Sequence, residues 1–211
     1  MVKAVIFDLD GVLVHTDELH YQAWKKIADE LSIPFDHEVN NRLRGVSRME
    51  SLDIILSYSN KTFSLTEREM LAEEKNEEYK RLLGSLGPKD LVEGALELLK
   101  YLKDKGIRVA IGSSSKNTKY ILQRLGIIDE FDAISDGNNI SKSKPDPEVF
   151  IKAASYLYLK VEDCMVVEDA RSGIDAAYAG GFKSFGIGDA SKYEKTNYPI
   201  KKLLDITKVI K

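Results

Sequence analysis

Residues 2–16 of the chain read VKAVIFDLDGVLVHT. The apolar run in this stretch covers residues 2–9 and leads into Asp-Leu-Asp-Gly at 8–11. A short, uninterrupted apolar run is typical of a strand that is buried on both faces, as the strands of parallel sheets are. Asp8 and Asp10 stand two residues apart at the end of this run, so in an extended chain their side chains share one face. We therefore expect a buried strand that delivers a pair of carboxylates to its carboxyl end.

A helical block follows this strand. Apolar residues recur at every fourth position from Leu19 to Leu31, and this period predicts an amphipathic helix. Helical patterns continue at 48–58 and 66–83, and no convincing strand pattern occurs between residues 15 and 89. Two glycines and a proline, within residues 84–88, then interrupt the pattern.

In the second half of the chain, predicted strands alternate with predicted helices. This alternation indicates a parallel sheet that is covered by helices on both faces, and the first strand suits the same sheet. We predict an α/β fold, a Rossmann-like parallel sheet core formed by residues 1–14 and 90–211, with residues 15–89 inserted as an α-helical cap. The expected strands are 107–112, 131–135, 164–167 and 183–187, and the expected helices are 93–105, 116–125, 148–158 and 171–179.

Composition excludes several classes of protein. The chain of 211 residues is 43% hydrophobic, which is enough to fill a core, and its 31 Lys and Arg nearly balance 34 Asp and Glu. This balance provides no basic field for nucleic acid or for a membrane surface. The single cysteine, Cys164, excludes an intrachain disulfide and a cysteine-based zinc site. The apolar runs are too short to span a bilayer, and Asp8 comes too early for a signal peptide. We expect a cytoplasmic monomer.

Four carboxylates are expected to meet at one edge of the sheet. In sheets of this type, ligands bind beyond the carboxyl ends of the strands, where Asp8 and Asp10 follow one strand and Glu168 and Asp169 follow another. Clustered carboxylates repel one another unless a cation lies between them, and a set of hard oxygen ligands favours Mg²⁺. The alternative for each pair taken alone is a solvated turn that caps a helix.

Phosphoryl transfer accounts for this set of residues and for two further features. An aspartate that attacks phosphorus forms an aspartyl-phosphate and divides one difficult step into two. Cationic and hydroxyl donors must then stabilise the transferring group, and Lys144 and the Gly-Ser-Ser-Ser run at 112–115 supply them. Taken alone, Lys144 is explained as a surface lysine and the serines as a helix cap. The sequence contains neither a GxxxxGK[ST] nor a GxGxxG motif.

The same residues resemble the four motifs of the haloacid dehalogenase superfamily. The motifs are DLDGVLVHT at 8–16, Ser113 after an apolar strand, Lys-Pro-Asp-Pro at 144–147 and Val-Glu-Asp at 167–169. The resemblance implies Mg²⁺-dependent phosphoryl transfer, with Asp8 as the nucleophile and Asp10 as the general acid and base. It also implies metal ligation by Asp8, the Asp10 backbone carbonyl and Asp169, with Glu168 assisting directly or through water. Ser113 and Lys144 would hold the phosphoryl group.

The expected cap resembles that of the β-phosphoglucomutase family. The similarity lies in His20 with Trp24, the run Arg-Gly-Val-Ser-Arg at 44–48 with Ser51, Lys75-Asn76 with Tyr79, and Ser-Ser-Ser-Lys-Asn at 113–117. It implies interconversion of β-D-glucose 1-phosphate and D-glucose 6-phosphate through β-glucose 1,6-bisphosphate, with a phosphorylated sugar as the partner. The predicted substrate-binding residues are Thr16, His20, Arg44, Gly45, Arg48, Ser51, Lys75, Ser114, Ser115, Lys116 and Asn117.

A mutase of this kind needs a second anion site, because the other phosphate of the bisphosphate must be held while the first reacts. Arg48 offers a bidentate guanidinium, and residues 115–117 stand at a predicted helix N-terminus, where free amides favour an anion. Other interpretations remain open. Arg48 is also explained as a solvated cation at a helix start, His20 as a packed residue at the cap edge, and Lys75 as part of a solvated face.

Two residues depart from the family pattern. His15 stands where an aspartate is common, at the expected hinge, and Arg44 stands where the mutases often have lysine, which differs in its hydrogen-bonding geometry. The second interpretation is a phosphatase that acts on a sugar phosphate or another small phosphomonoester, with water as the acceptor. A third is a catalytically silent phosphate-binding protein, which retention of every catalytic position argues against.

Overall fold

In the computed structural model, which describes residues 2–43 and 46–211, six parallel strands form one sheet in the order β3-β2-β1-β4-β5-β6. β1 lies between β2 and β4, with Phe7 paired to Ile111 on one side and to Val167 on the other. The strand order reverses beside β1, and in open α/β sheets ligands bind at such a point. The strands are β1 (Ala4–Phe7), β2 (Arg108–Gly112), β3 (Ala133–Ser135), β4 (Cys164–Glu168), β5 (Lys183–Gly186) and β6 (Tyr198–Pro199).

Helices cover both faces of the sheet, and the strand residues alternate between two apolar clusters. Val5 and Phe7 of β1 pack with α5, α6 and η5, whereas Ala4 and Ile6 pack with α7 and α8. This alternation explains why β1 is apolar at every position. The elements that cover the sheet are α5 (Ala95–Asp104), α6 (Thr118–Leu125), α7 (Glu148–Tyr156), α8 (Arg171–Ala179) and the 3-10 helices η1 (Pro88–Asp90), η2 (Ile128–Glu130), η3 (Val161–Asp163), η4 (Gly188–Lys192) and η5 (Leu203–Lys208).

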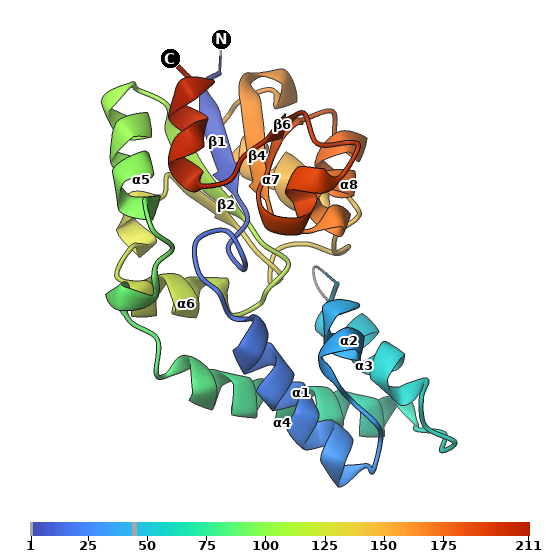
Figure 1. The fold of residues 1–211 in the computed structure, drawn as a ribbon. Helices are drawn as coiled ribbons and strands as arrows, with labels where there is room; N and C mark the ends of the chain where they lie inside the picture. Colours follow the sequence, from blue (N-terminus) through green and yellow to red (C-terminus); the bar gives the residue numbers. More distant parts are fainter. Residues whose placement is uncertain (1, 44–45) are drawn as a thin grey trace.

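The four remaining helices lie together beyond the carboxyl ends of the strands, and both chain termini lie at the opposite end of the molecule (Figure 1). They have an apolar cluster of their own around Trp24, Leu52 and Ile55. α3 and α4 each begin at a serine with a glutamate three residues later, and both form complete capping boxes. These helices are α1 (Asp17–Glu30), α2 (His37–Asn41), α3 (Arg48–Leu56) and α4 (Leu65–Leu83).

The two segments that connect the helical block to the sheet contact each other. The backbone amide of Val92 donates to the carbonyl of Leu13 at 2.9 Å. From the sheet side, the guanidinium of Arg124 on α6 donates to the carbonyls of Gly84 at 2.6 Å and Leu86 at 2.9 Å. These bonds fix where α4 ends relative to the core. No helix within the described residues is long and apolar enough to cross a bilayer.

Every predicted strand and helix is present, with shifts of one or two residues at most ends. Two features of the structure were not predicted. α2 is a helix of only five residues, capped by the side chain of Asp36, which accepts from the amide of Val39 at 2.9 Å. β6 is only two residues long and joins the edge of the sheet through register with Phe185 and Gly186. Both are too short to show a period in the sequence.

Candidate active site

Three carboxylates and one lysine form a buried cluster at the carboxyl ends of β1 and β4. Asp8, Glu168 and Asp169 each have a carboxylate oxygen within 4.8 Å of the others. The Nζ of Lys144 donates to Asp8 Oδ1 at 2.7 Å and to Glu168 Oε1 at 2.5 Å. Glu168 Oε2 also accepts from the amides of Asp169 and Ala170, at 2.9 and 3.0 Å. Parallel register of β1 with β4 brings these residues together, because Phe7 pairs with Val167.

The charges of this cluster do not balance. Burial raises the pKa of Asp8 well above its usual range, and the neighbouring carboxylates raise it further against the opposing effect of Lys144. Burial by itself would lower the pKa of Lys144, but the carboxylates of Asp8 and Glu168 more than reverse this and raise it, so the lysine is charged. Three carboxylates thus face one ammonium. A divalent cation held by carboxylate oxygens would restore the balance, and the hard-oxygen donor set suits Mg²⁺.

Gly11 gives Asp169 its place in the cluster. The glycine has φ +78°, and a Cβ at this position would stand 1.9 Å from Asp169 Oδ2. The loop after β1 therefore passes directly over the carboxylate, an approach that only glycine permits. Both oxygens of Glu168 accept hydrogen bonds from Lys144 and backbone amides, and Glu168 is also one of the three residues whose carboxylate oxygens lie close enough together to hold a metal ion.

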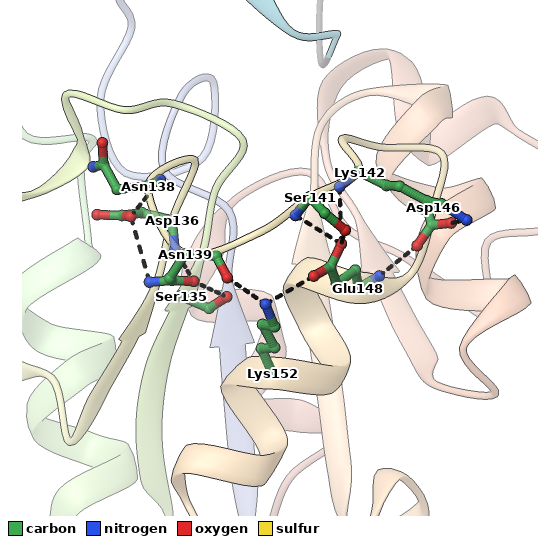
Figure 2. Close-up of polar contacts among 9 residues, drawn as sticks. All are labelled: Ser135, Asp136, Asn138, Asn139, Ser141, Lys142, Asp146, Glu148 and Lys152. Atoms are coloured by element: carbon green, nitrogen blue, oxygen red, sulfur yellow. Dashed lines mark hydrogen bonds and ion pairs between the residues drawn. The ribbon is translucent and has the colours of Figure 1, made fainter.

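Polar contacts hold the loop between β3 and α7, which carries Lys144, and Figure 2 shows the contacts made by its neighbours. The Glu148 carboxylate at the start of α7 accepts from the Ser141 amide at 2.9 Å, the Ser141 hydroxyl at 2.7 Å and the Lys142 amide at 2.8 Å. Lys152, one turn further along α7, pairs with Glu148 at 2.8 Å and donates to the Asn139 carbonyl. These hydrogen bonds lower the pKa of Glu148 to about 2. The part of the loop that precedes Lys144 is thus tied to α7 at three residues.

The turn between β2 and α6 presents hydroxyl and amide donors to the same space. Ser113 is buried, and its Oγ accepts from the Ser115 amide at 3.2 Å. α6 begins after Asn117, whose amide donates to Ser115 Oγ at 3.2 Å and whose side chain makes no capping hydrogen bond to the amides that follow. Free amides at a helix N-terminus attract an anion. Lys116, which is exposed, adds positive charge beside them.

Gly137 supports this turn from behind. Its amide donates to the Ser115 carbonyl at 3.1 Å, and a Cβ on it would stand 2.4 Å from the Ser114 carbonyl oxygen and 3.0 Å from the Lys116 amide nitrogen. The obstructing atoms belong to the backbone and have no freedom to move away. The Asp136-Gly137 pair could have been recognised in the sequence as a turn after a strand, but nothing in the sequence indicates which segment it packs against.

The first residues of the helical block contact Asp10. Thr16, which is fully buried at the N-cap of α1, donates its hydroxyl to Asp10 Oδ1. The carboxylate of Asp10 therefore lies toward α1, and it is not one of the three clustered carboxylates. Burial raises the pKa of Asp10, and the Thr16 hydrogen bond opposes this shift. His15, the departure noted at the hinge, is exposed.

Lys75 on α4, which is buried, contacts His20 on α1, which is partly buried. Lys75 Nζ lies 2.9 Å from His20 Nδ1, 4.8 Å from the centroid of the Trp24 ring and 4.4 Å from that of Tyr79. Burial and the nearby Arg48 guanidinium lower the pKa of Lys75 to about 7. Burial and the charge of Lys75 likewise hold the pKa of His20 well below its usual range. Lys75 is thus a buried amine rather than part of a solvated face.

Arg48 opens α3 on the opposite side of the space from Asp8. Its Nη1 donates to Glu73 at 3.2 Å and its Nη2 to Asn76 Oδ1 at 2.8 Å. Burial lowers the pKa of Arg48, against the effect of Glu73, and its partial burial distinguishes it from a solvated cation. Two other predicted residues of this segment, Arg44 and Gly45, lie outside the described residues.

These residues line one cavity of about 330 Å³ between the sheet and the helical block. Thr16 lies behind Asp10 and does not line it. Sequence reasoning missed Asn40, on the unpredicted helix α2, and Gly137 and Ser143, in the loops after β3. The predicted residues that line the cavity are Asp8, Asp10, His20, Arg48, Ser51, Lys75, Ser113, Ser114, Ser115, Lys116, Asn117, Lys144, Glu168 and Asp169.

The chain is similar to known proteins over most of its length. Residues 2–181 match the family model described as haloacid dehalogenase-like hydrolase. The chain is 42% identical to β-phosphoglucomutase of Bacillus subtilis, over 98% of this chain and 92% of that protein. It is 31% identical to the phosphorylated carbohydrates phosphatase of Thermotoga maritima, over 86% and 83%. The crystal structure of β-phosphoglucomutase from Clostridium difficile superposes with a TM-score of 0.93 at 39% identity, covering 99% of this chain and 96% of that one.

Proposed function

The chain belongs to the haloacid dehalogenase-like hydrolase family, and we propose from this premise that it interconverts β-D-glucose 1-phosphate and D-glucose 6-phosphate. The transfer passes through an aspartyl-phosphate on Asp8 and through β-glucose 1,6-bisphosphate. The observation that carries the proposal is a second set of anion-binding groups, Arg48 and the uncapped start of α6, in the same cavity as Asp8. A mutase uses two phosphate sites at once, whereas a phosphatase needs one.

Asp8 and Asp10 divide the chemistry between them. In one half-reaction, the sugar's 6-hydroxyl oxygen attacks the phosphorus of the aspartyl-phosphate, the bond from phosphorus to Asp8 breaks, and Asp10 takes the hydroxyl proton. The bisphosphate then binds in the opposite orientation. Asp8 attacks the phosphorus on O1, the bond from O1 to phosphorus breaks, and Asp10 returns the proton to O1. Glucose 6-phosphate leaves and the aspartyl-phosphate is restored.

Fixed donors in the core stabilise the transferring group. Lys144, held charged between Asp8 and Glu168, and the Ser113 hydroxyl would bind its oxygens. Asp8 and Asp169 would hold Mg²⁺ together with the Asp10 backbone carbonyl, with Glu168 assisting. When bound, the ion supplies charge neutralisation for the phosphoryl oxygens.

We propose that residues 15–89 act as a cap that excludes water from the aspartyl-phosphate. The contact between Thr16 and Asp10 ties the general acid to the first helix of the cap, so movement of the cap also moves the group that activates the acceptor. His20, Ser51 and Lys75 line the cap side of the cavity and would orient the sugar. We also propose that Arg44 and Gly45 bind the substrate.

A phosphatase remains the second candidate, because the phosphorylated carbohydrates phosphatase of Thermotoga maritima is also similar to this chain. Phosphorus NMR separates the two reactions. The purified protein is mixed with Mg²⁺, β-glucose 1-phosphate and a trace of β-glucose 1,6-bisphosphate, and the variant D8N serves as the inactive control. We expect glucose 6-phosphate to accumulate with little inorganic phosphate. Inorganic phosphate as the main product would refute the mutase.

A further inference from the structure

Asn76 on α4 connects the cap to the core at the distal end of the cavity. Its Oδ1 accepts two hydrogen bonds, from Arg48 Nη2 at 2.8 Å and from Asn117 Nδ2 at 3.0 Å. Arg48 belongs to the cap and Asn117 to the core, so one carbonyl oxygen serves donors from both. The side chain is buried, and its Nδ2 donates to Glu73 Oε1 at 3.2 Å, which fixes the orientation of the amide.

The two donors that meet at Asn76 are the groups expected to bind the second phosphate. Asn117 directs its side chain across to α4 and makes no side-chain cap for its own helix, and its amide donates to Ser115 Oγ at 3.2 Å. Arg48 donates a hydrogen bond from Nη2 to Asn76 and another from Nη1 to Glu73. Asn76 thus keeps the guanidinium of the cap close to the start of α6.

We propose that Asn76 is the positioning residue of the second phosphate site, the distal site formed by Arg48 and the start of α6. It acts by holding the side chains of Arg48 and Asn117 beside each other while remaining uncharged. This inference rests on the proposed mutase function. The guanidinium already pairs with the exposed carboxylate of Glu73 at 3.2 Å, and the amide oxygen of Asn76 attracts both donors without adding a second negative charge beside it. A carboxylate at the same place would also accept both hydrogen bonds, but it would pair with Arg48 and repel the phosphate.

The variant N76D tests this directly, since it preserves the shape of the side chain and changes its charge. Two phosphoryl donors are compared: β-glucose 1,6-bisphosphate, which fills both phosphate sites, and acetyl phosphate, which carries one phosphate. We expect N76D to lower kcat/KM for the bisphosphate at least tenfold more than for acetyl phosphate, mainly through KM. N76A, which removes the acceptor without adding charge, should fall between the wild type and N76D.

The matched control is N60D, which adds the same charge to the cap at an exposed position and should behave as the wild type with both donors. A variant that folds poorly would lose activity with both donors by the same factor, so a selective loss with the bisphosphate cannot come from poor folding. An unchanged ratio of the two kcat/KM values in N76D would overturn the inference. If the wild type itself produces no glucose 6-phosphate, the proposed function fails instead, and the two failures are therefore distinct.

Discussion

Replacement of Lys75 by methionine should change how the stability of the protein depends on pH. In the folded chain, burial and the Arg48 guanidinium lower the pKa of Lys75 from 10.5 to about 7. Between these two pH values the unfolded chain binds one proton more than the folded chain does, so the free energy of unfolding rises with pH. Methionine has a similar volume and no charge, and K75M therefore lacks this contribution.

The magnitude follows from the two pKa values. A single proton contributes at most about 1.4 kcal/mol per pH unit, and because titration is incomplete near pH 7 the wild type should gain about 2 kcal/mol relative to K75M between pH 7 and pH 9. The ring faces of Trp24 and Tyr79 attract the ammonium, which makes this an upper value. The measurement is urea unfolding of both proteins at several pH values.

Lys80 provides the matched control, because it lies on the same helix with its side chain 45% exposed. K80M should follow the pH dependence of the wild type. If the unfolding free energies of wild type and K75M run parallel from pH 7 to pH 9, then Lys75 carries its charge at neutral pH and our account of its burial is wrong.

Three further perturbations test other parts of the site. G137A should lower the unfolding free energy by about 1–3 kcal/mol and reduce mutase kcat/KM, because its methyl group meets the Ser114 carbonyl oxygen at 2.4 Å. The control is G87A, whose methyl group meets nothing within 4 Å. Equal effects of the two variants would contradict this prediction. K144M should cost about 3–5 kcal/mol in urea unfolding without metal, because it leaves two buried carboxylates unpaired; wild-type stability would argue against a buried ion pair. Chelation with EDTA should abolish glucose 6-phosphate formation and added Mg²⁺ should restore it, whereas turnover that persists in EDTA would exclude the proposed metal.

The core of the fold was predictable because its signals are local. An apolar run such as residues 4–7 reports burial on both faces, and a four-residue period such as that from Leu19 to Leu31 reports a helix with one buried face. α2 and β6 gave no such signal, since they have five and two residues. Their conformations depend on a side-chain cap and on pairing with an existing sheet edge.

The catalytic half of the candidate site was also predictable, because topology alone brings it together. Residues that end neighbouring parallel strands meet at one sheet edge, so Asp8 and Glu168 could be placed without knowing any side-chain conformation. Lys144 was assigned to the site by the family resemblance, and the structure adds how its loop is held, through the contacts of Glu148 with the Ser141 amide and of Lys152 with the Asn139 carbonyl.

The sequence by itself indicated the strands, the helices and the strand ends that carry carboxylates, because hydrophobic periodicity is encoded over a few neighbouring positions. Only the tertiary structure decided how the helical block meets the sheet. The hydrogen bonds from Asn117 to Asn76 and from Arg124 to the carbonyl of Gly84 join residues 41 and 40 positions apart. Pairings across such separations depend on how two independently packed units approach each other, and no local pattern in the chain specifies that approach.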